Sequence, residues 1–256
     1  MDSNELRILL EQIRAGTLGV HEAVQRLSDP PVSDLGYANV DLHRRQRCGF
    51  PEVIFCEGKS CDWVEGVVRK LIEAAQDCLA TRVNAEQAEQ LARQFPQGEQ
   101  DRLGRTFWLP AGPRQPPCGR VIVITAGTSD LPVAQEAVVT ARALGSEVEL
   151  LADVGVAGIH RLLRHRERFS QANAIVVVAG MDGALPSVVG GLVDCPVIAV
   201  PTSIGYGAAF GGLAPLLTML NSCSASVVVV NIDSGFKGGY VAAMIARSAR
   251  LRGQGT

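Results

Sequence analysis

Apolar runs alternate with segments of helical periodicity through the second half of the chain. The runs are mostly apolar, and they are RVIVIT, EVELL, NAIVVVA, CPVIAV and ASVVVV. Between them, segments such as PVAQEAVVTARALG have apolar residues every three or four positions. Buried strands that alternate with helices are typical of a parallel sheet covered by helices on both faces. The pattern therefore predicts a three-layer α/β domain over residues 120–256.

The first 110 residues are more polar, and they predict a smaller mixed α/β domain. Ser60 and Asn84 stand where helix N-caps belong, and Gln87 completes a capping box with Asn84. The segment from 109 to 120 has four prolines and two glycines, which predicts a linker at 111–119. The expected helices are 5–16, 20–27, 61–77 and 85–95, and the expected strands are 51–58, 78–83 and 104–110.

Polar and glycine-rich residues follow each apolar run of the second domain. An open parallel sheet forms its ligand site at the carboxyl ends of its strands, so these residues are the first candidates for binding. In chain order they are Thr128, Ser129 and Asp130, then Asp153, then Gly180, Met181, Asp182 and Gly183, then Ser203, Gly205, Tyr206 and Gly207, and finally Asp233.

Two of these segments have alternative interpretations. AGTSD precedes a helix, so its backbone N–H groups and hydroxyls could hold a phosphate or a carboxylate, or Ser129 or Asp130 could cap the helix. SIGYGAAFGG has the glycine spacing of a relaxed dinucleotide fingerprint, or it is a flexible loop that lines a pocket. Both interpretations leave room for a phosphate-sized group.

Composition excludes several classes of function. Lys and Arg number 24 against 26 Asp and Glu, and aromatic residues are 5% of the chain, so nucleic acid is not an expected partner. The apolar runs are too short to cross a bilayer, and the acidic N-terminus does not resemble a signal peptide. Seven cysteines without a CxxC pair favour reduced thiols in a cytoplasmic protein.

One cysteine differs from the others in its setting. Cys223 lies among Asn221, Ser222 and Ser224 between an expected helix and an expected strand, so it is either a bystander or a nucleophile. The end of a helix does not stabilise an anion, so a thiolate there needs a neighbouring cation. None of the four histidines lies in the strand-end loops; His43 belongs to a polar cluster in the first domain.

The second half resembles the PurE-type fold of phosphoribosylaminoimidazole (AIR) carboxylases. AGTSD matches the Ser-x-Ser-Asp phosphate turn of that family, and AGMDGALPSVVGGL matches its loop with a catalytic histidine, which falls on Ala184. From about residue 35 to 250 the chain more closely resembles the LarB family of nickel-pincer cofactor biosynthesis proteins. The blocks that carry this resemblance are NVDLHRRQRCGFPEVIFCEGKS, TAGTSDLPVAQEA, LNSCSAS and VVNIDSGFKGG.

This resemblance implies a flavodoxin-like (PurE-like) parallel sheet and a specific reaction. The reaction is carboxylation of the pyridinium ring of nicotinic acid adenine dinucleotide by CO2 or bicarbonate, with cleavage of the phosphoanhydride to release AMP. The family's nucleophilic cysteine falls on Cys223, and its usual Glu base falls on the shorter Asp182. The usual Asp-His-His-Arg reads Asp41, Leu42, His43 and Arg44 here.

The resemblance also implies partners and further site residues. Ser129 and Asp130 would hold phosphate and ribose, and the cation beside the thiol would be Lys59, Lys237 or Arg44. Mg²⁺ stays open as a cofactor, no protein-bound metal is expected, and PurE-like proteins imply a homo-oligomer, typically an octamer. Two alternatives stay open: a PurE-type aminoimidazole ribotide carboxylase or mutase, against which Ala184 argues, and a regulatory module that binds a dinucleotide without turning it over.

Overall fold

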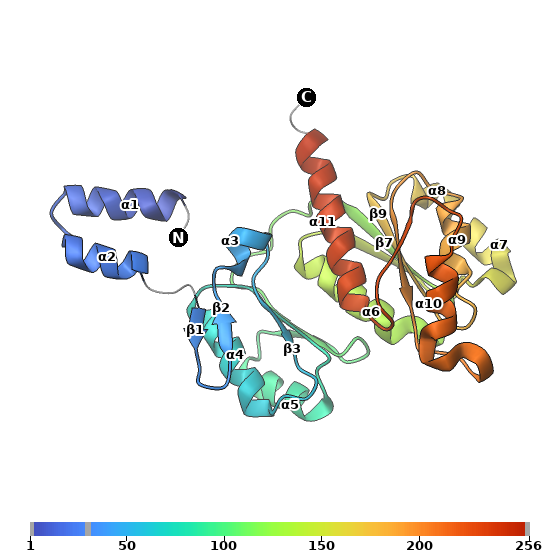
Figure 1. Cartoon of the computed structure of the whole chain (residues 1–256), viewed down its shortest axis with the longest axis horizontal. Coiled ribbons are helices and arrows are strands. Elements are labelled where there is room, and N and C mark those ends of the chain that lie inside the picture. The colour runs from blue at the N-terminus through green and yellow to red at the C-terminus, as the bar shows by residue number, and fades with distance from the viewer. Residues whose placement is uncertain (1–2, 29–31, 254–256) are drawn as a thin grey trace.

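The computed structural model describes residues 3–28 and 32–253 (Figure 1). The chain forms an N-terminal helical hairpin, an N-terminal unit (residues 32–109) and a C-terminal unit (residues 120–253). The predicted domain ranges also include residues 1–2, 29–31 and 254–256, which lie outside the described residues. Among the helices of residues 3–28 and 32–253, none has the length and apolar content that a bilayer crossing needs.

The C-terminal unit is built on a five-stranded parallel sheet of order β11-β10-β9-β7-β8. The three central strands are buried throughout, which explains why their sequences are continuous apolar runs. All five predicted strands are confirmed, although the last is shorter than its apolar run. Their bounds are β7 (Arg120–Thr125), β8 (Glu147–Leu151), β9 (Ala174–Ala179), β10 (Val197–Pro201) and β11 (Val227–Val229).

Helices cover both faces of this sheet. On one face, α6 and α11 pack against β7, β9 and β10, and on the other face α7 to α10 enclose a second apolar cluster. The helices are α6 (Leu131–Ala143), α7 (Ile159–Leu163), α8 (Arg166–Phe169), α9 (Leu185–Gly190), α10 (Leu213–Leu220) and α11 (Gly235–Gly253), with 3₁₀ turns η1 (Thr128–Asp130), η2 (Val156–Gly158) and η3 (Gly207–Gly212).

The N-terminal unit has a four-stranded sheet of order β3-β4-β6-β5 and a two-stranded ribbon of β1 and β2. Its predicted helix starts are confirmed: Ser60 accepts from the Trp63 amide, and Asn84 and Gln87 form the capping box. Its elements are β1 (Val32–Asp34), β2 (Asn39–Asp41), α3 (Arg44–Cys48), β3 (Val53–Phe55), α4 (Cys61–Glu73), β4 (Cys78–Thr81), α5 (Ala85–Gln94), β5 (Glu99–Asp101) and β6 (Thr106–Leu109).

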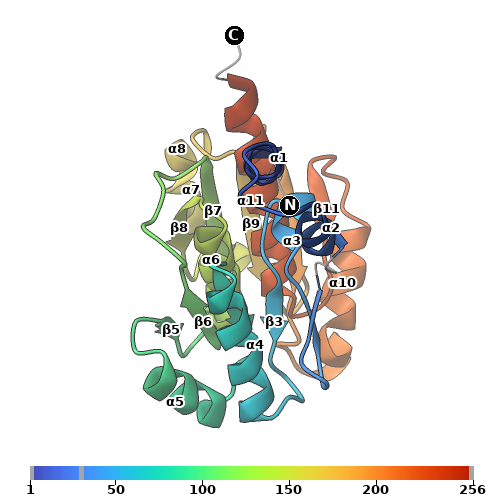
Figure 2. The ribbon, with the colours of Figure 1, turned by 90° about the vertical axis from the view of Figure 1, so that its left-hand side faces the viewer.

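The two faces of this smaller sheet have different partners. Ala80 and Phe107 are paired across β4 and β6 and join the core under α4 and α5, which face the viewer in Figure 2. The next pair, Leu79 and Trp108, points to the other side and joins the core around α6 and α11. Alternate residues of the strands therefore tie the N-terminal unit to the C-terminal unit.

Four short elements, β1, β2, α3 and β5, were not predicted, whereas the helices expected at 5–16 and 20–27 are present as α1 (Ser3–Arg14) and α2 (Val20–Ser28). The strand β5 reads EQD because it is an edge strand, and β1 and β2 pair only with each other. The hairpin of α1 and α2 has a small core of its own around Leu9, Leu18 and Ala23. In Figure 1 this hairpin stands apart from both sheets.

Replacing Gly239 with Ala should lower the free energy of unfolding by about 1–3 kcal/mol, the usual cost of overpacking. A Cβ at Gly239 would lie 2.3 Å from the backbone oxygen of Ala137, where α11 crosses α6. Urea denaturation measures the change. Gly112→Ala is the matched control, since a Cβ there meets nothing within 4 Å. Equal stabilities of the two variants would contradict this packing.

Candidate functional site

The strand-end loops of the C-terminal unit gather at the carboxyl edge of its sheet. Thr128 and Ser129 are exposed, whereas Asp130 is 4% exposed. The Asp130 carboxylate accepts hydrogen bonds from the Thr202 hydroxyl at 2.7 Å and from the Gly127 amide at 2.9 Å. Burial raises the pKa of Asp130, and these two hydrogen bonds oppose that shift. Asp130 thus joins two loops and caps its own turn, while the two hydroxyls beside it are left for a ligand.

Residues at three of the strand ends have the left-handed backbone conformation. Asp153, Met181 and Asp233 follow β8, β9 and β11 with φ of 57°, 52° and 54°. Such strain persists in residues without glycine's freedom only where the surrounding structure enforces it, and it clusters at functional sites. The strained residues lie at the carboxyl edge of the sheet, which is where the sequence predicts the ligand site.

The carboxylates of this edge differ in their partners. Asp233 accepts from the Ser203 amide at 2.8 Å, and Asp153 pairs with Arg161 at 2.7 Å. Asp182 is exposed and accepts only a 3.3 Å hydrogen bond from the Ala184 amide, at the start of α9. Of these three acids, Asp182 is therefore the exposed one that is held by neither an ion pair nor a short hydrogen bond.

The glycine-rich segment lies directly against the loop after β9. The Met181 amide donates to the Ile204 carbonyl at 2.9 Å, and a Cβ at Gly180 would lie 2.2 Å from that carbonyl oxygen. Glycine is needed at this close approach. The neighbouring residues are open to solvent: Ser203, Gly205, Tyr206 and Gly207 are exposed, Gly183 is buried and Ala184 is half-buried.

Cys223 forms no hydrogen bond with these carboxylates among the described residues. It is exposed in the turn between α10 and β11, on the side where the strands begin. Ser222 and Ser224, its neighbours, contact Ser187 of α9 through 2.8 Å hydrogen bonds. Within the described residues, the Cys223 sulfur has no hydrogen bond or ion pair. No hydrogen bond joins Cys223 to Asp182 among the described residues, although Ser187, which bonds both neighbours of Cys223, lies in the same helix α9 that begins just after Asp182.

The basic candidates are also dispersed. Lys59 follows β3, where its ammonium donates to the Phe55 carbonyl. His43 and Arg44 begin α3, whose end lies beside Arg247 of α11. Lys237 is exposed in the first turn of α11, next to the strand ends rather than to Cys223. Among the described residues, none of Lys59, Lys237 and Arg44 forms a hydrogen bond or ion pair with Cys223, and the cation beside the thiol stays a prediction.

Three of the other cysteines are buried, whereas Cys48 is exposed like Cys223. Burial raises the pKa of Cys56 to about 12 and also raises that of Cys78 and Cys195. Raised thiol pKa values disfavour the thiolate that a nucleophile needs. Across residues 3–28 and 32–253, no group of three or more His, Cys, Asp or Glu side chains could hold a metal ion.

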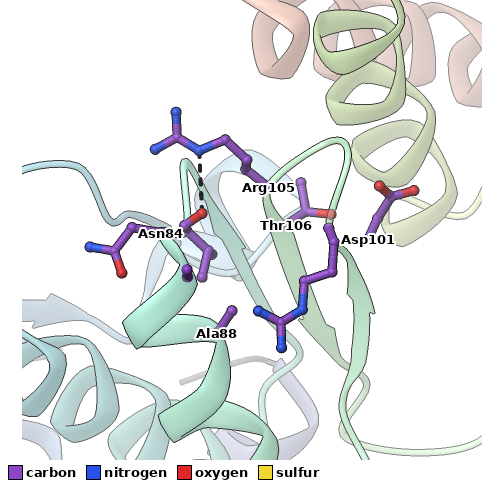
Figure 3. A pocket seen from close by; sticks show the side chains of 8 residues that line it. Asn84, Ala88, Asp101, Arg105 and Thr106 are labelled. Carbon is purple, nitrogen blue, oxygen red and sulfur yellow. Dashed lines mark hydrogen bonds between the residues drawn. The ribbon is translucent and has the colours of Figure 1, made fainter.

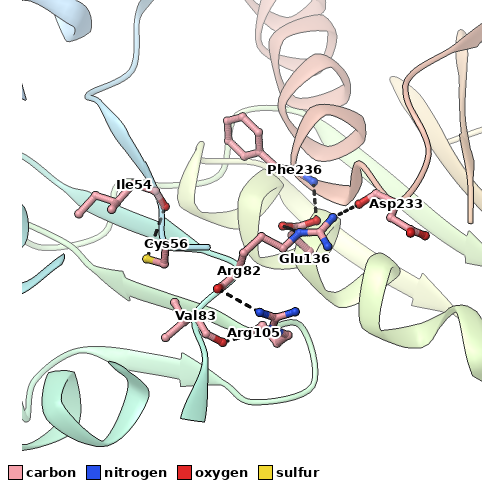
Figure 4. Close-up of polar contacts among 8 residues, drawn as sticks. All are labelled: Ile54, Cys56, Arg82, Val83, Arg105, Glu136, Asp233 and Phe236. Atoms are coloured by element: carbon pink, nitrogen blue, oxygen red, sulfur yellow. Dashed lines mark hydrogen bonds and ion pairs between the residues drawn. The ribbon is translucent and has the colours of Figure 1, made fainter. Parts of the chain in front are cut away.

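Sequence reasoning missed a buried ion pair between the two units. Arg82 follows β4 and pairs with Glu136 of α6 at 3.2 Å, and its guanidinium also donates to the Asp233 carbonyl (Figure 4). Glu136 is 2% exposed and accepts from the Phe236 amide. A glutamate at a core-facing position of the segment PVAQEAVV was the available signal. Arg82 and Glu136 together hold the loop that carries Asp233.

A cavity of about 410 Å³ lies within the N-terminal unit, between the start of α5 and the turn from β5 to β6. Figure 3 shows Asn84, Asp101 and Arg105 around it, with Arg105 donating to the Val83 carbonyl. None of the site residues expected from the sequence lines this cavity.

Family models match both units of the chain. Residues 32–111 match the model described as the LarB/PurE-like N-terminal domain, and residues 120–252 match the model described as AIR carboxylase. The chain belongs to the LarB/PurE-like family. This LarB/PurE-like chain is 41% identical to an uncharacterized protein of Methanocaldococcus jannaschii over 216 residues, which are 81% of this chain and 83% of that protein.

The chain is also similar to two solved structures. A PurE2 variant of Treponema denticola has a TM-score of 0.39 and 17% identity, and the match covers 55% of this chain and 92% of the other. PurE of Treponema denticola gives the same TM-score and identity over 53% and 91% of the two chains. The family membership and the observed sheet confirm the expected PurE-like α/β fold with a smaller N-terminal α/β unit.

Replacing Arg82 with Ala should destabilise this LarB/PurE-like chain by about 3 kcal/mol at neutral pH, because Glu136 would stay buried without its guanidinium. Burial already raises the pKa of Glu136, so its carboxyl takes up a proton as the pH falls, and the loss should shrink toward acidic pH. Urea denaturation at two pH values measures both effects.

The double variant Arg82→Ala/Glu136→Gln is the control for this prediction. It removes the unpaired charge and should recover most of the loss at neutral pH. A loss that is independent of pH and is not recovered would mean that Arg82 acts only through its hydrogen bond to Asp233.

Proposed function

We propose that the protein is a pyridinium-3,5-biscarboxylic acid mononucleotide synthase. It would carboxylate C5 of the pyridinium ring of nicotinic acid adenine dinucleotide and cleave the phosphoanhydride to release AMP, in nickel-pincer cofactor biosynthesis. The single observation that carries the proposal is Cys223, an exposed thiol in a serine-rich turn of a LarB/PurE-like chain. The PurE-type reaction is disfavoured because Ala184 offers only a methyl group where that family has histidine.

The chemistry requires a thiolate because a pyridinium carbon cannot attack CO2. Addition of the Cys223 thiolate to C4 gives a neutral dihydropyridine in which C5 is an enamine-like nucleophile. C5 then forms a bond to CO2. A base removes the C5 proton, and the electron pair of that C–H bond expels the thiolate and restores the aromatic ring. Asp182 is the proposed base, since it is the exposed acid that is held by neither an ion pair nor a short hydrogen bond.

This mechanism puts a geometric constraint on the two side chains. C4 and C5 are bonded neighbours. The Cys223 sulfur must therefore reach C4, and the base must come within hydrogen-bonding reach of the proton on C5 of the same ring. Among the described residues no hydrogen bond joins Cys223 to Asp182 in one chain, and PurE-type proteins are homo-oligomers. We therefore propose that Cys223 of one subunit acts with the strand-end loops of a neighbouring subunit.

The surface of α10 supports this arrangement. Leu213, Leu217 and Leu220 are 44%, 49% and 60% exposed, and their spacing puts them on one face of the helix. Phe210, 74% exposed, precedes them. Exposed apolar patches of this kind typically mark protein interfaces. Because α10 runs from the glycine-rich segment to Cys223, a second copy on this face would lie next to both.

Incubation with nicotinic acid adenine dinucleotide, bicarbonate and Mg²⁺ should yield AMP and a nucleotide that is heavier by one carboxylate. Mg²⁺ is supplied because phosphates commonly bind it. Cys223→Ala should lose carboxylation by about 1000-fold, the scale of a lost nucleophile. Mass spectrometry of the products measures both. Cys61→Ala is the matched thiol control, and full carboxylation by Cys223→Ala would refute the covalent step.

Mixed oligomers test the shared site. Cys223→Ala and Asp182→Asn subunits, each inactive alone, should regain activity when they are co-expressed, because about one quarter of the sites in a random assembly would combine an intact Cys223 with an intact Asp182. If both groups come from one chain, the mixture should stay inactive. Native mass spectrometry of the co-expressed sample verifies that both variants share oligomers.

A further inference from the structure

A second and larger cavity lies between the two units. Its volume is about 810 Å³, and it is lined by residues of α3 and the loop after it, by the proline-rich segment 110–118, and by the C-terminal parts of α6 and α11. Ser146, which lines the cavity, directly precedes β8, so the cavity lies at the amino-terminal edge of the parallel sheet, where the strands begin. It is therefore on the opposite edge of the sheet from the strand-end loops.

The walls of this cavity are strongly cationic. The chain as a whole has a net charge of -2, yet four guanidinium groups and a single carboxylate line the cavity. The carboxylate, Asp77, already accepts a hydrogen bond from the Ala111 amide at 2.8 Å. The four guanidiniums belong to Arg45, Arg114, Arg142 and Arg247.

Two of these arginines are held in place by aromatic rings. Arg114 lies 4.5 Å from the centre of the Trp108 ring, and Arg247 lies 5.9 Å from that of Phe50. Arg114 also pairs with Glu99, and Arg247 donates to the Gly49 carbonyl. Each guanidinium has five N–H donors in a rigid fork, so these contacts leave donors for a further acceptor.

Two buried polar atoms of the cavity wall have no partner. Trp108 and Ser146 both line the cavity, and neither Trp108 Nε1 nor Ser146 Oγ has a hydrogen bond. An unsatisfied buried donor is unfavourable, and an indole N–H can only donate. Both atoms are shielded from solvent, so the donors that a ligand in the cavity can reach are those of the lining guanidinium groups, which favour a ligand rich in acceptors over a cation or a purely apolar ligand.

We propose that this cavity binds a small oxyanion, a molecule with phosphate or carboxylate groups, at a site separate from the candidate active site. The inference does not depend on the proposed reaction. The guanidinium fork matches both kinds of oxyanion, and the volume is in the usual range for small-molecule sites. The aromatic rings would shield the bound charges from water.

The chain offers its own probe for this site. It has two tryptophans, Trp63 and Trp108, so Trp63→Phe leaves the cavity residue as the only indole. Titration of Trp63→Phe with inorganic phosphate, AMP or citrate at constant ionic strength should give a saturable change in Trp108 emission for at least one of the three. Saturation by phosphate or AMP would identify a phosphate site, and saturation by citrate alone would identify a carboxylate site.

Charge-neutral variants in the Trp63→Phe background separate specific from general binding. Arg142→Gln should weaken binding of the saturating anion at least tenfold, whereas Arg166→Gln, an exposed residue of α8 away from the cavity, should not. Circular dichroism verifies that each variant is folded. The proposal is overturned if none of the three anions gives saturation, or if Arg142→Gln and Arg166→Gln bind equally. Failure of the carboxylation assay would leave this result unaffected.

Discussion

Helix α6 is covered on both sides, and the rest of the architecture depends on this constraint. One side packs on the parallel sheet with α11, and the other side receives Leu79 and Trp108 from the N-terminal unit. A helix between two sheets cannot have a polar face, so its buried positions are small or apolar apart from Thr140 and Glu136. The buried Glu136 is tolerable because Arg82 from the other unit pairs with it. The two units are thus joined by packing and by one charge pair.

Most of the C-terminal fold could be predicted from the sequence because its signals are local. Continuous apolar runs mark its buried strands, and in the N-terminal unit the capping residues Ser60 and Asn84 mark helix starts in the same local way. The unpredicted strand β5 has no apolar pattern, since only one of its edges is paired. The pairing of Arg82 with Glu136 joins residues 54 positions apart, and no local pattern encodes such a contact.

The candidate site also has one part that could be predicted from local sequence signals and one part that could not. The strand-end residues could be predicted because every parallel strand delivers the segment after it to one edge, and the strained backbone of Asp153, Met181 and Asp233 lies there. The resemblance grouped Cys223 with Asp182 by motif. However, a residue just before a strand lies on the side where strands begin, and a residue just after one lies at the other edge. The connectivity of the fold therefore delivers the two residues from different edges of the sheet, and α9, which begins just after Asp182 and bonds Ser222 and Ser224 through Ser187, connects their surroundings.

The helices α6 and α11 connect the two edges of the sheet. Both begin beside strand-end loops, next to Asp130 and Asp233, and both reach the cationic cavity with their later turns. A helix has a partial negative charge at its C-terminal end, which by itself repels an anion. Two arginines compensate for that charge: Arg142 in the last turn of α6 and Arg247 in the later part of α11. They can bind an anion only with the N–H donors that are not already used in contacts with the protein. An anion in the cavity would contact the last turns of two helices whose first turns adjoin the strand-end loops. If a ligand of those loops changes the affinity of the cavity for the anion, the anion must change the affinity of the loops for that ligand by the same factor.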